Sequence, residues 1–244
     1  MMRLDKFLVS TGEFTRSTAK DAIKAGRITV DGNVATRPEI KVDEEISEVC
    51  LDGISVTYKK FHYLMMNKPA GYLSATEDKR DATVLDLLPD KYKKIGLFPA
   101  GRLDKDAEGF LLLTDDGALA HGLMSPKHNV EKVYEATVDK SLDEEDIAAF
   151  REGVIIDGDY KCLPAKLEIP ECFEKRLGVT TVTEGRFHQV KKMFLSRNKC
   201  VIYLKRISIA GVKLDFSLKT GEFRELLDEE VELLYLKAGV KKIG

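Results

Sequence analysis

The feature that most restricts the fold is a charged loop held between two apolar runs. Residues 97–99 lead into the loop, and residues 110–113 lead out of it towards an Asp-Asp-Gly turn at 115–117. Short apolar runs that stop at turn signals are typical of buried strands. The loop between them carries three carboxylates: Asp104, Asp106 and Glu108. The sequence therefore predicts a sheet with a carboxylate loop at its rim.

Asp104 can be interpreted in two ways. Charged loops usually face water, and on that ground alone all three carboxylates would be solvated. Asp104, however, lies between Arg102 and Lys105, so cations favour its ionised form where the loop is partly buried. It also follows Leu103, which can anchor the loop in the core. These two features make Asp104 the candidate functional carboxylate.

The composition fits a soluble globular protein with one large domain and a small appendage. Charged residues make up 33% of the 244 residues and apolar residues 43%. No apolar run approaches the roughly 18 residues of a membrane span, and Met1-Met2-Arg3 does not begin a signal peptide. We therefore expect a cytoplasmic monomer that does not associate with membranes.

The sequence predicts neither a metal site nor a bound cofactor. The histidines lack metal-ligand spacing, and there is no phosphate-binding glycine loop or dinucleotide motif. The net charge of −2 argues against a uniformly basic nucleic-acid binder but is compatible with local basic faces. Four scattered cysteines are expected to be buried, reduced thiols: Cys50, Cys162, Cys172 and Cys200.

Residues 1–59 are predicted to form a module of their own, ahead of a larger domain at 60–244. One helix is expected near residues 4–8, and a second between Thr15 and Gly26. A basic helix side can bind phosphate or simply face water, and the spacing leaves both open. One side of the second helix carries three basic residues spaced by four: Arg16, Lys20 and Lys24.

The larger domain is predicted to be α+β, with a mainly antiparallel mixed sheet. Strands outnumber helices and do not alternate regularly with them. An acidic helix ending near Arg151 is expected to begin with a capping box formed by Ser141 and Glu144. A later helix is predicted to bury Val190 together with two neighbours on the same stripe, Met193 and Phe194.

Four segments of the larger domain resemble the RNA pseudouridine synthases, and specifically the RsuA-like branch that modifies ribosomal RNA. The most specific is the Gly-Arg-Leu-Asp loop with its continuation to Gly117. The others are Asn67-Lys68-Pro69, Lys132-Val133-Tyr134 and residues 184–194. The resemblance implies that Asp104 is the catalytic carboxylate, that Tyr134 lies against the target base, and that Lys191 forms an ion pair with Asp104. It also suggests that Arg102 binds phosphate or fills the space of an extruded nucleotide.

Residues 2–50 resemble the small S4-like RNA-binding domain. The residue types and the two resemblances together give a set of expected RNA-contacting side chains in both domains. Those expected in the first domain are Arg3, Lys6, Arg16, Lys20, Lys24 and Arg27; those expected in the second are Lys68, Lys132, His188 and Gln189. For Lys68 the sequence leaves phosphate and water open, and the resembled family's Asn-Lys-Pro is mainly structural.

The resemblance implies an isomerase that converts one uridine of small-subunit (16S) ribosomal RNA to pseudouridine. Its partner would be 16S RNA or a small-subunit assembly intermediate, and an isomerisation needs no cofactor. A large-subunit (23S) RNA substrate is the nearest alternative. A non-catalytic RNA-binding assembly factor is a second, and a hydrolase that uses Asp104 and Asp106 is a third.

Overall fold

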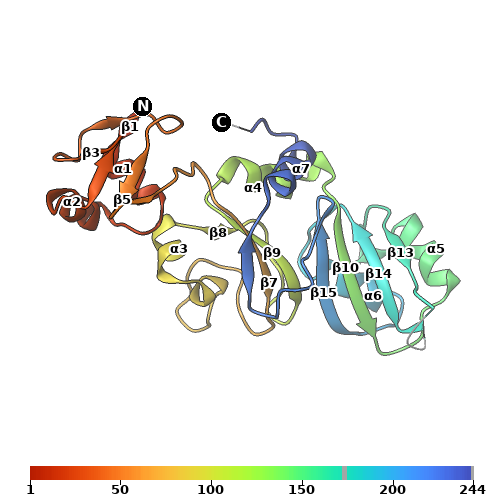
Figure 1. The fold of residues 1–244 in the computed structure, drawn as a ribbon. Coiled ribbons are helices and arrows are strands. Elements are labelled where there is room, and N and C mark those ends of the chain that lie inside the picture. Colours follow the sequence, from red (N-terminus) through yellow and green to blue (C-terminus); the bar gives the residue numbers. More distant parts are fainter. Residues whose placement is uncertain (172–174, 243–244) are drawn as a thin grey trace. The chain divides into compact units, whose positions relative to one another are not determined.

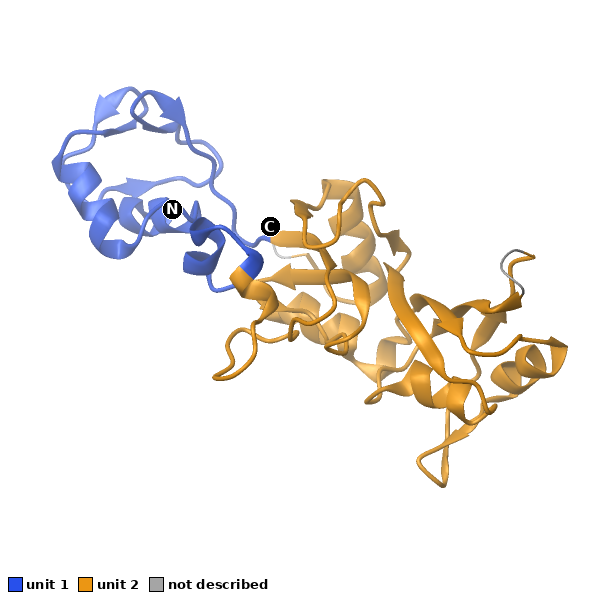
Figure 2. Ribbon diagram, turned by 90° about the horizontal axis from the view of Figure 1, so that it is seen from below, with its two compact units in different colours: residues 1–62, 87–97, 244 blue, residues 63–86, 98–243 orange. Residues whose placement is uncertain are grey.

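The computed structural model describes residues 1–171 and 175–242, which form two compact units (Figure 2). The first unit comprises Met1–His62 and Leu87–Leu97. The second comprises Tyr63–Asp86 and the described chain from Phe98 onward. Residues 87–97 join the first unit through close packing, since a Cβ on Gly12 would lie 2.8 Å from the backbone oxygen of Lys91.

The first unit contains the two predicted N-terminal helices and several short strands. The side-chain oxygen of Thr15 accepts a hydrogen bond from the Thr18 amide at 3.2 Å and caps the second helix, as predicted. Ala19, Ala22 and Ile23 on that helix are buried, so the opposite side faces solvent. The elements are β1 (Met2–Arg3), α1 (Leu4–Ser10), α2 (Arg16–Lys24), β2 (Ile28–Val30), β3 (Asn33–Val34), β4 (Lys41–Val42), β5 (Val49–Leu51), β6 (Ile54–Ser55) and α3 (Asp90–Ile95).

A single nine-stranded sheet organises the second unit (Figure 1). Its main path runs β13-β14-β10-β15-β9-β7-β17, with β16 paired to β15 and β8 to β9. Its pairings are antiparallel except the one between β15 and β9, which confirms the predicted mainly antiparallel α+β fold. The strands are β7 (Tyr63–Lys68), β8 (Phe98–Pro99), β9 (Glu108–Thr114), β10 (Lys132–Val138), β13 (Lys166–Glu168), β14 (Leu177–Val182), β15 (Val201–Ile209), β16 (Val212–Lys213) and β17 (Phe223–Glu225).

Helices cover this sheet at both ends. Figure 1 shows α4 and α7 side by side near β7 and β9, where Leu123 and Leu234 share a core with Phe110 and Leu112 of β9. At the other end α5 packs beside β13, and α6 buries Val190, Met193 and Phe194, as predicted. The remaining elements are η1 (Val84–Leu87), α4 (Gly117–Met124), η2 (Pro126–His128), α5 (Glu144–Glu152), β11 (Ile155–Ile156), β12 (Tyr160–Lys161), α6 (Gln189–Leu195) and α7 (Asp228–Ala238).

The predicted cap of α5 is wrong by two residues. The residue that caps the helix is Asp143, not Ser141: its carboxylate accepts from the Asp146 amide at 3.0 Å, and Asp146 accepts from the Asp143 amide at 3.1 Å. Both Ser and Asp are good N-caps, and each has an acidic residue three positions later. The local sequence therefore contains two equivalent N-cap positions for α5, and in the structure the helix begins after the later one.

The cysteine prediction holds only in part. In the portion of the chain that the structure describes, three cysteines are free: Cys162 is buried, Cys50 is partly buried and Cys200 is exposed. The prediction for Cys172 lies outside the described residues. Among the described helices, none combines the length and apolar character needed to cross a bilayer.

Candidate functional site

The backbone of the 101–107 loop is held from beneath by Lys68, the last residue of β7. This side chain is 0% exposed, and burial lowers its pKa to about 8. A buried ammonium that gathers the carbonyls of one loop restrains that loop to a narrow range of conformations. Its Nζ shares its protons among four backbone oxygens, those of Pro69, Asp104, Lys105 and Ala107, at 2.9, 3.2, 3.3 and 2.8 Å.

A second anchor holds the loop at Leu103. The Leu103 side chain is buried, and the Ser74 hydroxyl both accepts from the Leu103 amide and donates to its carbonyl, each at 3.0 Å. The residue that follows, Asp104, therefore leaves a fixed backbone with its side chain 22% exposed. The sequence expectation that Leu103 anchors the loop while Asp104 faces outward agrees with this geometry.

Two cationic or titratable groups approach the Asp104 carboxylate. Its Oδ1 lies 3.5 Å from Nε2 of His188, and its Oδ2 lies 3.4 Å from Nζ of Lys191. Lys191 makes a shorter contact, 2.6 Å, with Oδ1 of Asp106, and this hydrogen bond lowers the pKa of Asp106. Lys191 thus bridges both carboxylates, but the Asp106 side chain is 75% exposed and Asp104 is not.

Asp104 faces a pocket formed by four separate segments of the second unit. The floor and walls come from the 101–107 loop, from β10 and β15, and from the turn that precedes α6. The pocket combines a half-buried carboxylate with an aromatic ring and cationic groups, so it can bind a flat, polar ring and act on an atom beside it. Residues that line it include Arg102, Asp104, Tyr134, His188, Gln189 and Leu204.

Tyr134 reaches the pocket from β10, and a residue that the sequence analysis missed lies behind it. Tyr134 is 9% exposed, and its hydroxyl oxygen accepts a hydrogen bond from Nη1 of Arg206 at 3.4 Å. Arg206 is 1% exposed and belongs to β15. A signal was present in the sequence: along β15 an arginine shares the inward-facing alternation with Leu204 and Ser208.

Gln189, the first residue of α6, holds the turn that precedes this helix. The Gln189 side chain is buried, its oxygen accepts from the Arg186 amide at 3.0 Å, and its nitrogen donates to Glu184 at 2.8 Å. The amide group is thus engaged within the turn, and the expected contact of Gln189 with RNA stays a prediction. His188, next to it, has a left-handed backbone (φ 55°) and stacks on Phe187 with ring centroids 3.7 Å apart.

Lys68 and Lys132 were also expected to contact RNA, and this stays a prediction. Both ammonium groups are buried, with Lys132 only 4% exposed and its Nζ donating to the Val130 carbonyl at 3.0 Å. Burial, followed by the nearby charge of Arg206, lowers the pKa of Lys132 to about 8. The sequence indicated that both lysines lie at strand ends, but it could not show that their side chains are buried.

The predicted basic residues of the first unit lie in two different settings. Arg3 pairs with Asp5 at 2.8 Å, and Arg27 pairs with Asp52 at 2.5 Å, so part of their charge is matched within the unit. The others are exposed: Lys6 on α1, and Arg16, Lys20 and Lys24 on α2. Within the described ranges, no group of three or more His, Cys, Asp or Glu residues could hold a metal ion.

Comparisons with known proteins agree with this architecture. Residues 62–196 match the RNA pseudouridylate synthase family, and residues 2–45 match the S4 domain. The chain is 49% identical over 234 residues to an uncharacterised RNA pseudouridine synthase of Bacillus subtilis (strain 168), covering 96% of this chain and 98% of that protein.

One further relative has a more specific description, and one solved structure is similar to the chain. The ribosomal small subunit pseudouridine synthase A of Haemophilus influenzae is 37% identical over 235 residues, with 96% of this chain and 99% of that protein covered. A crystal structure of a pseudouridylate synthase aligns with a TM-score of 0.66 and 36% identity, covering 96% of this chain and all (100%) of the other.

Proposed function

Because the chain belongs to the RNA pseudouridylate synthase family, we propose that it isomerises one uridine of small-subunit (16S) ribosomal RNA, with Asp104 as the catalytic carboxylate. The observation that carries this proposal is the position of Asp104, which contacts His188 and Lys191 and lines the same pocket as Tyr134. The small-subunit assignment is supported by the name of the Haemophilus influenzae relative and by similarity over nearly the whole of both chains.

Asp104 supplies the carboxylate that the reaction requires at the sugar. The bond between uracil N1 and ribose C1′ breaks, the base turns, and a bond from C5 to C1′ replaces it, while C5 loses a proton and N1 gains one. Asp104 acts either as a nucleophile at the sugar or as a base that removes a sugar proton. The Lys191 ammonium lies 3.4 Å from the Asp104 carboxylate and helps to hold it in place for either role.

Tyr134 and Arg102 are assigned to the base and to the strand that carries it. A uridine in a paired region must be flipped out before it can enter this pocket. The Tyr134 ring provides a wall against which the flipped base can stack. Arg102 is exposed and lines the same pocket, where its guanidinium can bind a phosphate or fill the space that the base leaves.

RNA binding outside the pocket is assigned to residues 1–59, and the catalytic domain to residues 60–244. The exposed side of α2 supports this assignment, because its three basic residues follow one another along a single face of a capped helix. Lys6 on α1 adds a fourth exposed cation, while Arg3 and Arg27 contribute with their charge partly matched. We further propose that the enzyme acts as a monomer in the cytoplasm.

The first experiment maps pseudouridines in total ribosomal RNA from cells that lack this protein. We expect one site in small-subunit RNA to disappear, to return with the wild-type protein and to stay absent with Asp104→Asn. Asp104→Asn keeps the shape of the side chain but removes its charge, so the expected loss of single-turnover rate is at least about 10⁴-fold. Binding of the same RNA by Asp104→Asn should stay within about threefold of wild type.

The control variant is Asp106→Asn, which removes the neighbouring exposed carboxylate but leaves Asp104 in place. Ribosomal RNA from cells that carry Asp106→Asn should still contain the pseudouridine. If the missing pseudouridine lies in large-subunit RNA instead, the reaction is as proposed but the substrate is large-subunit RNA. Loss of no site, with RNA binding intact, would favour an assembly factor, and equal inactivation by both variants would favour a mechanism that needs two carboxylates.

A further inference from the structure

Arg206 is a buried cation with an incomplete set of partners, one strand away from the catalytic loop. Its Nε donates to the Phe110 carbonyl at 2.8 Å, and its Nη1 donates to the Tyr134 oxygen at 3.4 Å. Its Nη2 is buried and has no hydrogen-bond partner among the described residues. An unsatisfied buried donor is uncommon and costs free energy, so its retention requires an explanation.

The backbone around Arg206 is built to place this side chain. Arg206 pairs in register with Gly109 of β9 on one side and with Tyr134 of β10 on the other. The register with β10 shifts between Val133 and Tyr134, and such bulges re-aim side chains beside active sites. A Cβ on Gly109 would lie only 2.2 Å from the Arg206 carbonyl oxygen, so the close approach of β9 requires glycine there.

The charge of Arg206 also lacks a nearby counterion. No carboxylate within the described residues lies at ion-pair distance from its guanidinium, and the two buried ammonium groups of Lys68 and Lys132 are close enough for Arg206 to oppose their protonation. Burying an unpaired charge destabilises a folded protein. Lys68 has carboxylates nearby, but Arg206 and Lys132 lie on neighbouring strands with their like charges opposed.

We propose that Arg206 is a positioning residue that acts through Tyr134, an inference that rests on the proposed function. Because the Tyr134 oxygen accepts the hydrogen bond from Nη1, its own O–H is turned away from Arg206. When the N1–C1′ bond breaks, the electron pair stays on the uracil ring. The Tyr134 ring, polarised by the cation that is hydrogen-bonded to its hydroxyl, then stabilises the negative charge of the base that stacks on it.

A double-mutant cycle tests this inference. RNA labelled with tritium at uridine C5 releases the label when the C5–C1′ bond forms, which gives a single-turnover rate for the full-length protein. We expect Arg206→Met to lower this rate by about 10²-fold and Arg206→Lys, which keeps the charge, to lower it by about 10-fold. In a Tyr134→Phe background the same changes should cost no more than about threefold, because the residue through which Arg206 acts is gone.

Arg224→Met is the matched control, since Arg224 is an arginine of the same sheet with complete partners. It should lose thermal stability but keep the single-turnover rate. Equal losses from the Arg206 changes in both backgrounds would overturn the inference and assign Arg206 a purely structural role. If Arg206→Met does not fold, Arg206→Lys decides in the same way. Wild-type protein that releases no tritium from ribosomal RNA would instead refute the proposed function.

Discussion

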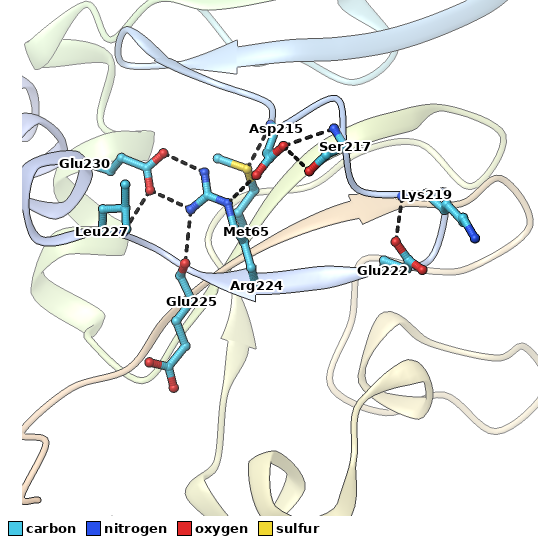
Figure 3. A network of polar contacts seen from close by, with 9 residues as sticks. All are labelled: Met65, Asp215, Ser217, Lys219, Glu222, Arg224, Glu225, Leu227 and Glu230. Atoms are coloured by element: carbon cyan, nitrogen blue, oxygen red, sulfur yellow. Dashed lines mark hydrogen bonds and ion pairs between the residues drawn. The ribbon is translucent and has the colours of Figure 1, made fainter.

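Two arginines of one sheet, Arg206 on β15 and Arg224 on β17, have opposite surroundings. Arg224 donates from Nε to Asp215 at 2.7 Å and from both terminal nitrogens to Glu230 at 2.7 and 2.8 Å, so each of its nitrogens is paired (Figure 3). Arg206 is more deeply buried, has a neutral carbonyl and a phenol as partners, and leaves Nη2 unpaired. A fully paired arginine stabilises the fold. A buried arginine with an unpaired nitrogen lowers the stability of the fold, and its charge is available to a functional site.

The two arginines also differ in the charge of their ionisable neighbours. Beside Arg224, hydrogen bonds from Ser217 and then from Arg224 lower the pKa of Asp215 to about 2, so the network stays ionised at neutral pH. Beside Arg206, burial and then the arginine itself lower the pKa of Lys132. Arg224 is therefore surrounded by opposite charges, whereas Arg206 and Lys132 carry the same charge.

The largest expected effect tests how tightly the backbone is fitted around Arg206. Gly109 and Gly221 both have positive φ, +101° and +92°, but a Cβ on Gly109 meets the Arg206 backbone and one on Gly221 meets nothing within 4 Å. Gly109→Ala combines strain with a steric clash and should cost more than about 3 kcal/mol of unfolding free energy, together with activity. Gly221→Ala carries the strain alone, about 1–2 kcal/mol. Urea denaturation of the two variants measures the difference, and equal costs would contradict the close fit.

A smaller effect is expected where the pairing is complete. Arg224→Met removes hydrogen bonds to two carboxylates and leaves them facing each other in a partly buried setting. We expect a loss of about 2–3 kcal/mol in unfolding free energy, with the single-turnover rate unchanged within about twofold. Thermal or urea denaturation checks the first value and tritium release the second. If Arg224→Met lost much of its single-turnover rate at unchanged stability, Arg224 would not be a purely structural arginine.

The smallest expected effect is a pH dependence from Lys132. Its pKa is about 8 in the fold against an ordinary value of 10.5, so between these values the unfolded chain binds the extra proton. Stability must therefore rise with pH across this window. The unfolding free energy of wild type, relative to that of Lys132→Met, should increase by about 2 kcal/mol from pH 7.5 to 9.5. Urea denaturation of both proteins at the two pH values measures this difference, and no increase would mean that Lys132 is not desolvated.

Several elements could be predicted from the sequence because they depend on neighbours along the chain. The helices α1, α2 and α6 follow from apolar spacing, and the Thr15 cap follows from residue type and position. The carboxylate loop was recognised because flanking apolar runs and its own residue string are local. These features define the elements of the fold and the family, and they single out Asp104.

Only the tertiary structure decided what lies behind the pocket. The exposure of Lys68 and Lys132, and the contact between Arg206 and Tyr134, depend on which strands pair and in which register. A single bulge between Val133 and Tyr134 sets which residue of β15 faces the tyrosine, and nothing in the local sequence of either strand specifies it. Local sequence determines the period and the ends of an element, but burial and charge pairing are properties of the assembled sheet.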